Sequence, residues 1–136
     1  MTLMSKPSES AGRILFVDDD GDTCEMMRLL LQHSGYRVTT AETIVDALGL
    51  ARAERFDLYL LDNWLPDGLG LELCRQLRAL YPASPIVFYS GIAQESEIQK
   101  ARAAGADDYL IKPCDFELLQ NTIAEFLQKN LQSPIT

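Results

Sequence analysis

The chain contains four short, nearly unbroken apolar runs, at residues 14–17, 58–61, 86–89 and 109–111. Runs of this length that are rich in β-branched and aromatic residues are typical of strands covered on both faces of a sheet. A fifth segment, residues 36–40, alternates apolar with polar positions. This alternation predicts a strand with one exposed face, at an edge of the sheet.

Segments with helical spacing lie between these runs. Gly35 ends the first predicted helix, Thr43 caps the second, and Pro82 ends the third. A short fourth helix covers residues 94–103, and the fifth begins at Asp115. The apolar positions expected to face the sheet are Met27, Leu30 and Leu31 in the first helix, Ala47, Leu50 and Ala51 in the second, Leu73, Cys74, Leu77 and Leu80 in the third, and Phe116, Leu119, Ile123, Phe126 and Leu127 in the fifth.

Five strands that alternate with single helices predict a parallel sheet, because each connection must cross over the sheet in the right-handed sense. Five such units are too few for a closed eight-stranded barrel. The expected fold class is therefore α/β, an open, doubly wound, five-stranded parallel sheet with helices on both faces. In sheets of this kind, functional residues lie beyond the carboxyl ends of the strands.

The composition is that of one ordinary globular domain of 136 residues, of which 47% are apolar and 24% charged. Residues 1–12 are polar and are expected to form a disordered leader, because they lack the apolar stretch of a secretory signal. No apolar run approaches the roughly 20 residues that span a bilayer, so no membrane association is expected.

The charge and the cysteine content indicate which binding partners and which cellular compartment to expect. Twenty acidic against twelve basic side chains give a net charge of −8, which opposes direct binding to nucleic acid. Cys24, Cys74 and Cys114 form neither a CxxC pair nor a metal-ligand spacing. We therefore expect reduced thiols and a cytoplasmic location.

Polar residues follow four of the predicted strands at the point where each strand ends: Asp18, Asp19 and Asp20, then Asp62, then Ser90, then Lys112. The carboxyl ends of parallel strands meet at one edge of the sheet, so these side chains are expected to converge. Clustered carboxylates repel one another unless they share a cation, and hard oxygen ligands favour Mg²⁺. Carboxylates, a lysine, a hydroxyl and a divalent ion together suit phosphoryl transfer, with one carboxylate as the nucleophile that forms an aspartyl phosphate.

The chain resembles the receiver domain of two-component response regulators in four segments that occur in the right order: ILFVDDD, LYLLDNWLPDGLG, PIVFYSG and GADDYLIKP. The resemblance covers residues 13–131, which are expected to form one receiver domain, and leaves residues 132–136 as a tail or the start of a linker. It implies the flavodoxin-like fold with strand order 2-1-3-4-5.

The resemblance also implies a role for each polar residue at the strand ends. Asp62 matches the phosphoacceptor, and Asp18 and Asp19 match the acidic pair that holds Mg²⁺. Ser90 matches the hydroxyl that bonds the phosphoryl group, and Lys112 matches the lysine that pairs with it.

Two further positions match the family. Trp64 stands where the backbone carbonyl is a metal ligand, and Tyr109 stands where an aromatic side chain acts as a switch. By this resemblance, Ser90 moves toward the phosphoryl group and Tyr109 turns from an exposed to a buried position. Trp64 is bulky for its place and, with Ile92, would cover the aspartyl phosphate, which predicts slow spontaneous dephosphorylation.

The implied function is that of a phosphorylation-dependent signalling switch rather than an enzyme. The phosphoryl donor would be a phosphohistidine of a sensor histidine kinase or of a histidine phosphotransfer protein. A downstream effector is expected to bind the face formed by the fourth helix, the fifth strand and the fifth helix, and phosphorylation is expected to allow a homodimer.

Two other interpretations stay open. The segment DDDGDT also resembles the opening motif of haloacid-dehalogenase-type phosphatases, with Asp18 as the nucleophile and Asp20 as the acid–base. Against it, the chain lacks room for a cap domain, and this interpretation leaves Asp62 with its LPDGLG tail unexplained. A degenerate receiver that only binds partners is the second alternative, and the presence of every expected site residue argues against it.

Overall fold

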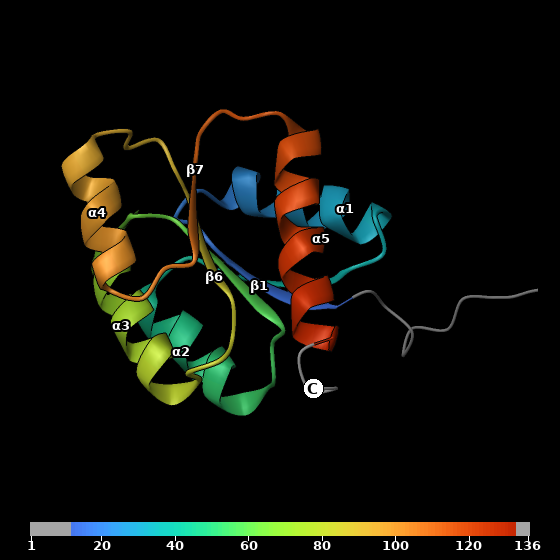
Figure 1. Cartoon of the computed structure of the whole chain (residues 1–136), viewed down its shortest axis with the longest axis horizontal. Helices are drawn as coiled ribbons and strands as arrows, with labels where there is room; N and C mark the ends of the chain where they lie inside the picture. Colours follow the sequence, from blue (N-terminus) through green and yellow to red (C-terminus); the bar gives the residue numbers. More distant parts are fainter. Residues whose placement is uncertain (1–11, 133–136) are drawn as a thin grey trace, which may run out of the picture.

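The computed structural model describes residues 12–132. Five strands form one parallel sheet in the spatial order β2-β1-β3-β6-β7 (Figure 1). Their bounds are Arg13–Val17 (β1), Arg37–Ala41 (β2), Leu58–Leu61 (β3), Ile86–Ser90 (β6) and Asp108–Ile111 (β7). Counted along the chain among the sheet strands alone, this order is 2-1-3-4-5, so the predicted α/β fold is confirmed.

The predicted ends of the chain fall mostly outside this range. Of the predicted leader, residues 1–11 lie outside the described residues, and so do residues 133–136 of the predicted tail.

Five helices cover the two faces of the sheet: α1 (Gly21–His33), α2 (Ile44–Ala53), α3 (Gly70–Leu80), α4 (Glu95–Ala103) and α5 (Phe116–Gln132). Helices α1 and α5 lie on one face, and α2, α3 and α4 lie on the other (Figure 1). No helix among the described residues is both long enough and apolar enough to cross a membrane.

Burial on both faces explains why the strands are continuous apolar runs. In β1, Ile14 and Phe16 pack in the cluster under α1 and α5, whereas Leu15 and Val17 pack in the cluster under α2, α3 and α4. All four side chains are at most 1% exposed. Successive side chains of a strand point to opposite faces, so a sheet covered on both sides needs an apolar residue at every position.

Two of the apolar helix positions expected to face the sheet do not. Leu30 is 38% exposed and Leu80 is 42% exposed. The buried stripe of α1 consists of Cys24, Met27 and Leu31, which places Leu30 beside the stripe rather than within it. Leu80 is the last residue of α3, where the helix leaves the sheet.

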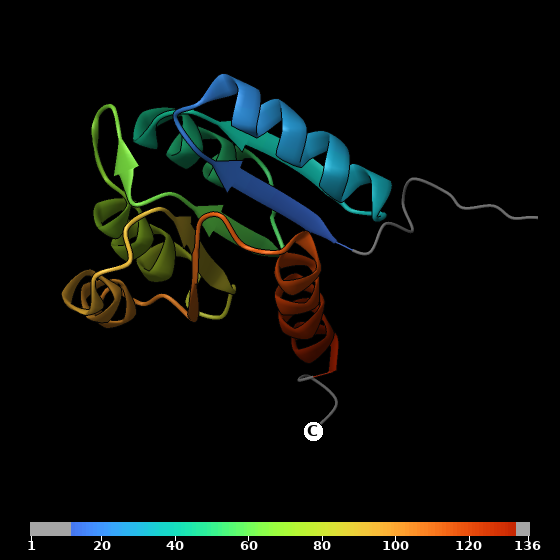
Figure 2. The same ribbon diagram turned by 90° about the horizontal axis from the view of Figure 1, so that it is seen from above.

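A short antiparallel ladder between β3 and α3 was not expected from the sequence. Its strands are β4 (Trp64–Leu65) and β5 (Gly68–Leu69), joined by Pro66 and Asp67. Figure 2 shows this hairpin beyond the carboxyl end of the sheet. Strands of two residues are too short to produce the alternation by which a strand is recognised.

The start of α2 is held by two side chains. The Thr43 hydroxyl accepts a hydrogen bond of 3.0 Å from the Asp46 backbone N–H, which confirms the predicted cap. Asp67 accepts from the N–H groups of Ile44 at 2.9 Å and Val45 at 3.1 Å. The hairpin is therefore tied to α2 as well as to the end of β3.

Candidate functional site

The carboxyl ends of β1 and β3 bring three carboxylates together. Val17 and Leu61 are partners in the parallel ladder, so the residues that follow them leave the sheet side by side. One carboxylate oxygen from each of Asp18, Asp19 and Asp62 lies within 4.8 Å of the other two. Asp18 is buried, Asp62 is partly buried and Asp19 is exposed, so the cluster opens to solvent on one side.

Lys112, from the end of β7, reaches into this cluster. Its Nζ lies 2.7 Å from Asp18 Oδ2 and 3.4 Å from Asp62 Oδ2. Its backbone N–H donates to the Ser90 carbonyl at 2.8 Å, which fixes β7 against the end of β6. The Lys112 ammonium also lies 5.4 Å from the centre of the Tyr89 ring, within the range of a cation–π contact. Of the side chains expected to converge at this edge of the sheet, the structure brings together those of Asp18, Asp19, Asp62 and Lys112.

The charges of the site perturb one another. Burial raises the pKa of the Asp62 carboxyl above its ordinary value, the Asp18 charge adds to this effect, and Lys112 opposes it. For Lys112, burial lowers the pKa, but the hydrogen bond to Asp18 and the charge of Asp62 outweigh burial, so the pKa is raised. The lysine is therefore a fixed positive charge at neutral pH.

The donor set fits a divalent metal ion. Three acidic side chains face one basic side chain, so the acidic groups of the cluster outnumber the basic ones. Carboxylate oxygens are hard ligands, and Mg²⁺ in proteins is commonly held by one or two carboxylates together with water and phosphate oxygens. The exposed side of the cluster, at Asp19, gives such water and phosphate ligands access.

Ser90 and Tyr109 are linked through one residue of the loop after β6. Ser90 is 1% exposed, and its hydroxyl accepts a hydrogen bond of 3.2 Å from the Ile92 backbone N–H. The Tyr109 hydroxyl donates to the Ile92 carbonyl at 2.7 Å. Tyr109 also stacks on Phe88, with 5.6 Å between the ring centres, and is 8% exposed. Tyr109 thus occupies the buried position here, and its exposed position remains a prediction.

Trp64 lies over the same loop. Its side chain is 63% exposed and lines a surface hollow of about 550 Å³ together with residues 91–94, which include Ile92. Trp64 and Ile92 line the same hollow, so their predicted proximity is confirmed. The role of the Trp64 backbone carbonyl as a metal ligand remains a prediction.

Two residues beside Asp62 were not singled out from the sequence. Asn63 is 1% exposed, and neither its amide nitrogen nor its side-chain oxygen has a hydrogen-bond partner among the described residues. Gly70 donates its N–H to the Asn63 carbonyl at 2.6 Å. A Cβ at Gly70 would lie 2.1 Å from the Asp62 carbonyl oxygen, so only glycine fits. Gly70 is the last residue of the LPDGLG segment, and this glycine was the sequence feature that could have predicted the close approach.

Asp20 stands apart from the carboxylate cluster. Its side chain accepts a hydrogen bond of 2.6 Å from the Thr23 hydroxyl, and this bond lowers the pKa of the Asp20 carboxyl. A general acid works best with a pKa near the operating pH. The lowered pKa gives no support to Asp20 as the acid–base of the phosphatase interpretation.

Comparison with known proteins agrees with the geometry. The family model of the response regulator receiver domain matches residues 14–124. The transcriptional regulatory protein ZraR of Salmonella typhimurium is 40% identical over 114 residues, which are 84% of this chain and 26% of that protein. The sensor histidine kinase AruS of Pseudomonas aeruginosa is 39% identical over 122 residues, which are 87% of this chain and 12% of that protein. The chain therefore spans about a quarter or less of the length of these two relatives.

A solved structure gives the same result for the fold. The crystal structure of a two-component response regulator from Clostridium difficile is similar, with a TM-score of 0.85 and 32% identity, and the match covers 89% of this chain and 98% of that one. The segment matched by the family model extends from β1 into α5 and contains every carboxylate of the cluster as well as Lys112. On these grounds the chain belongs to the response regulator receiver domain family.

Proposed function

We propose that this chain is a phosphorylation-dependent signalling switch in which Asp62 accepts a phosphoryl group from a phosphohistidine. The donor is a sensor histidine kinase or a histidine phosphotransfer protein. The observation that supports the proposal most directly is the meeting of Asp18, Asp19, Asp62 and Lys112 at one edge of the sheet. The chain acts as a regulatory domain that promotes only its own phosphorylation and dephosphorylation.

Asp62 is the nucleophile in this proposal. One of its carboxylate oxygens attacks phosphorus and forms a P–O bond, while the P–N bond to the donor imidazole breaks and its electron pair stays on the ring nitrogen. The Lys112 ammonium, 3.4 Å from Asp62 Oδ2, is close enough to pair with an oxygen of the transferred group. The Ser90 hydroxyl, at the end of β6, donates a further hydrogen bond to that group.

Asp18, Asp19 and Asp62 are the side chains that would hold Mg²⁺, with the backbone carbonyl of Trp64 as a further ligand. Bound there, the ion supplies positive charge that offsets the negative charge of the phosphoryl oxygens. The short contact between Asp18 and Lys112 holds the buried side chain of Asp18 in place within the cluster.

The chain of contacts through Ile92 offers a route from the site to the surface. Ser90 and Tyr109 bond the N–H and the carbonyl of Ile92, so a movement of Ser90 toward the phosphoryl group pulls on the residue that holds Tyr109. Tyr109 lies in β7, which contacts α4 and belongs to the proposed effector-binding face. Ile111 and Leu118 on this face are exposed apolar side chains that suit a protein partner, either the effector or a second copy of the chain.

A cytoplasmic location is part of the proposal. The three cysteines are free thiols, as is typical of proteins in a reducing compartment.

The decisive experiment is phosphorylation with acetyl phosphate and Mg²⁺. The wild-type chain is expected to take up one phosphoryl group in a bond that hydroxylamine cleaves, as an acyl phosphate requires. Asp62→Ala is expected to abolish labelling, whereas Asp46→Ala, which removes an exposed carboxylate of α2, is expected to leave it unchanged.

Two results would contradict the proposal. Label that resists hydroxylamine would exclude an aspartyl phosphate. Label that persists in Asp62→Ala but is lost in Asp18→Ala would favour the phosphatase interpretation, in which Asp18 is the nucleophile.

A further inference from the structure

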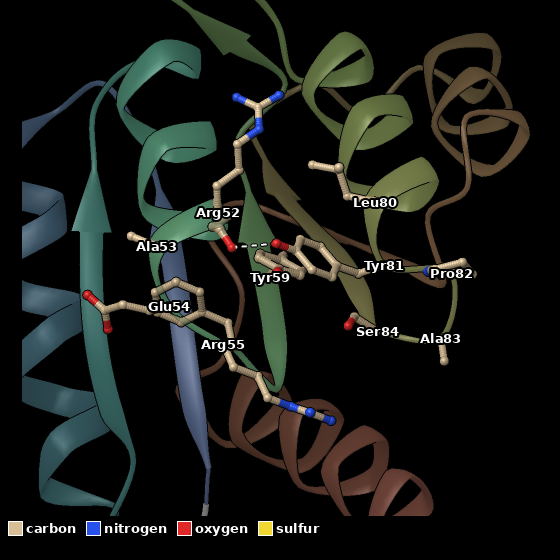
Figure 3. A pocket seen from close by; sticks show the side chains of 12 residues that line it. Arg52, Ala53, Glu54, Arg55, Tyr59, Leu80, Tyr81, Pro82, Ala83 and Ser84 are labelled. Carbon is tan, nitrogen blue, oxygen red and sulfur yellow. Dashed lines mark hydrogen bonds between the residues drawn. The ribbon is translucent and has the colours of Figure 1, made fainter.

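A surface pocket of about 520 Å³ lies at the end of the sheet opposite to the carboxylate cluster (Figure 3). It is formed by the last turn of α2, the segment 54–56 that leads into β3, Tyr59 of β3, and residues 80–84 after α3. None of the residues assigned to phosphorylation lines it. Its volume falls within the range of about 300–1,000 Å³ that is typical of small-molecule sites.

Tyr59 contributes a hydroxyl without a protein partner to the lining of this pocket. The residue is 1% exposed, yet no described residue forms a hydrogen bond with its hydroxyl. The neighbouring Tyr81 differs, because its hydroxyl donates to the Ala51 carbonyl at 2.6 Å (Figure 3). The Tyr59 hydroxyl is not among the fully buried side-chain atoms that lack a partner, so a ligand in the pocket can reach it. Burial raises the pKa of Tyr59 to about 12, so its hydroxyl is protonated at neutral pH and available as a donor.

The unpaired charge of the pocket lining is positive. Arg52 and Arg55 are exposed and form no ion pair with any described residue. The one acidic residue of the lining, Glu54, is paired with Arg13. Figure 3 shows the side chains of Arg52 and Arg55 extending to opposite sides of the two tyrosine rings. In a chain with a net charge of −8, this is a local site for an anion.

The walls of the pocket favour a planar apolar body. The rings of Tyr59 and Tyr81 are stacked, with 6.2 Å between their centres and an angle of 23° between their planes. Leu80 and Pro82 add apolar surface on the side of α3. Aromatic rings bury much apolar area and pair with other rings in offset or edge-on arrangements.

We propose that this pocket binds a small planar aromatic carboxylate. The ring of the ligand packs against Tyr81, Leu80 and Pro82. A carboxylate oxygen accepts a hydrogen bond from the Tyr59 hydroxyl, and Arg55 pairs with its charge. Arg52, on the other side of the rings, adds positive potential. This binding site is independent of Asp62 and does not rest on the proposed phosphorylation.

The test is a titration of the whole chain with three probes, followed by NMR. The probes are 2-naphthoate, the neutral 2-naphthylmethanol, which has the same ring system, and propionate, which has the charge without the ring. Naphthoate is expected to shift the amide signals of residues 51–59 and 80–84 and to bind at least about tenfold more tightly than either other probe. Failure of naphthoate to bind, or equal binding of all three probes, would overturn the proposal.

Three variants assign the contacts. Tyr59→Phe removes only the hydroxyl and is expected to weaken naphthoate binding about tenfold, the effect of one charge-assisted hydrogen bond. The double variant Arg52→Gln/Arg55→Gln is expected to lose the preference for naphthoate over the neutral probe. Arg75→Gln, which removes an exposed arginine of α3 outside the pocket, is the control that keeps this preference. Unchanged affinity in Tyr59→Phe together with an unchanged preference in the double variant would also overturn the proposal.

Discussion

The Tyr109 hydroxyl donates a 2.7 Å hydrogen bond to the Ile92 carbonyl, and this bond ties β7 to the loop that leaves the end of β6. The same Ile92 donates its N–H to Ser90, so one residue connects the proposed phosphoryl-binding hydroxyl with the proposed switch side chain. The loop is thereby held from both sides in this conformation.

Replacing Tyr109 by phenylalanine removes this bond and leaves the stacked ring in place. Because the Ile92 carbonyl loses its partner, Tyr109→Phe is expected to lower the free energy of unfolding by about 1 kcal/mol. Urea denaturation measures this change. The control is Tyr36→Phe, since the hydroxyl of the buried Tyr36 has no hydrogen-bond partner among the described residues. A loss in Tyr36→Phe as large as that in Tyr109→Phe would show that the Ile92 bond does not stabilise the fold.

The approach of Gly70 to the backbone of Asp62 predicts a strong effect of one methyl group. In Gly70→Ala the new Cβ would meet the Asp62 carbonyl oxygen at 2.1 Å, so the backbone that positions the Asp62 carboxylate must shift. Overpacking of this kind costs about 1–3 kcal/mol of stability. A loss of phosphorylation by acetyl phosphate is expected as well, because the carboxylate moves with its backbone.

Gly49 provides the matched control for Gly70. It lies within α2, and a Cβ placed there meets no atom within 4 Å. Gly49→Ala is expected to stabilise the chain by about 0.5–1 kcal/mol, because alanine favours the helix, and to leave phosphorylation unchanged. If Gly70→Ala is as stable and as readily phosphorylated as Gly49→Ala, the close approach of residue 70 to Asp62 does not matter for the fold or for phosphorylation.

The raised pKa of Asp62 gives the pH dependence of stability a definite sign. A carboxyl whose pKa in the folded chain lies above the ordinary value of 3.8 binds its proton more tightly when folded. Its contribution to stability is present at low pH and is lost as the pH rises through the folded pKa. Asp62→Asn has no carboxyl to ionise, so its stability relative to the wild type is expected to rise as the pH increases from below 3.8 through the folded pKa of Asp62.

Asp67 is expected to behave in the opposite way. The hydrogen bonds from the N–H groups at the start of α2 lower the pKa of Asp67 below 3.8. Its stabilisation is therefore present at neutral pH and is lost as the pH falls through the folded pKa. Asp67→Asn should be less stable than the wild type at pH 7, with a difference that shrinks in acid. Denaturant unfolding of both variants at several pH values measures how the stability difference from the wild type changes with pH. A change in the same direction for Asp62→Asn and Asp67→Asn would contradict this explanation.

The sequence predicted the part of the site that depends on chain topology. Asp18 and Lys112 are 94 residues apart, yet each follows an apolar run, and the carboxyl ends of parallel strands share one edge. Their contact could therefore be predicted from the positions of the strands along the chain and the order in which the strands pair.

Features that depend on side-chain packing could not be predicted in this way. The burial of Asn63 without a partner and the bond between Tyr109 and Ile92 are decided by atoms from distant segments. Local spacing gives the helix or strand face of a residue, but not the shape of the neighbour it meets.

The acidic cluster predicts that metal binding depends on Asp19. Asp19→Asn removes one of three clustered carboxylates, and even outer partners of metal ligands are worth 10–100-fold in affinity. The Mg²⁺ affinity is therefore expected to fall at least about tenfold. Trp64, the single tryptophan, lies two residues after Asp62, so its fluorescence can follow the titration without any phosphoryl donor. Asp22→Asn, which removes an exposed acid of α1 outside the cluster, should bind Mg²⁺ like the wild type, and equal losses in both variants would contradict a specific site.

Trp64 and Ile92 together predict the lifetime of the phosphorylated state. Both line one surface hollow over the loop after β6, and the large exposed indole lies two residues after Asp62. We expect the indole to hinder water from reaching a phosphoryl group on Asp62. Trp64→Asn removes this cover and is expected to speed hydrolysis about five- to tenfold, equivalent to roughly 1–1.4 kcal/mol of activation free energy. The measurement is the decay of label in the presence of Mg²⁺ after removal of acetyl phosphate. Leu69→Asn is the matched control, because Leu69 is exposed and pairs with Trp64 in the hairpin but does not line the hollow. A Trp64→Asn decay as slow as that of the wild type, or equal acceleration in Leu69→Asn, would show that the indole does not shield the phosphoryl group.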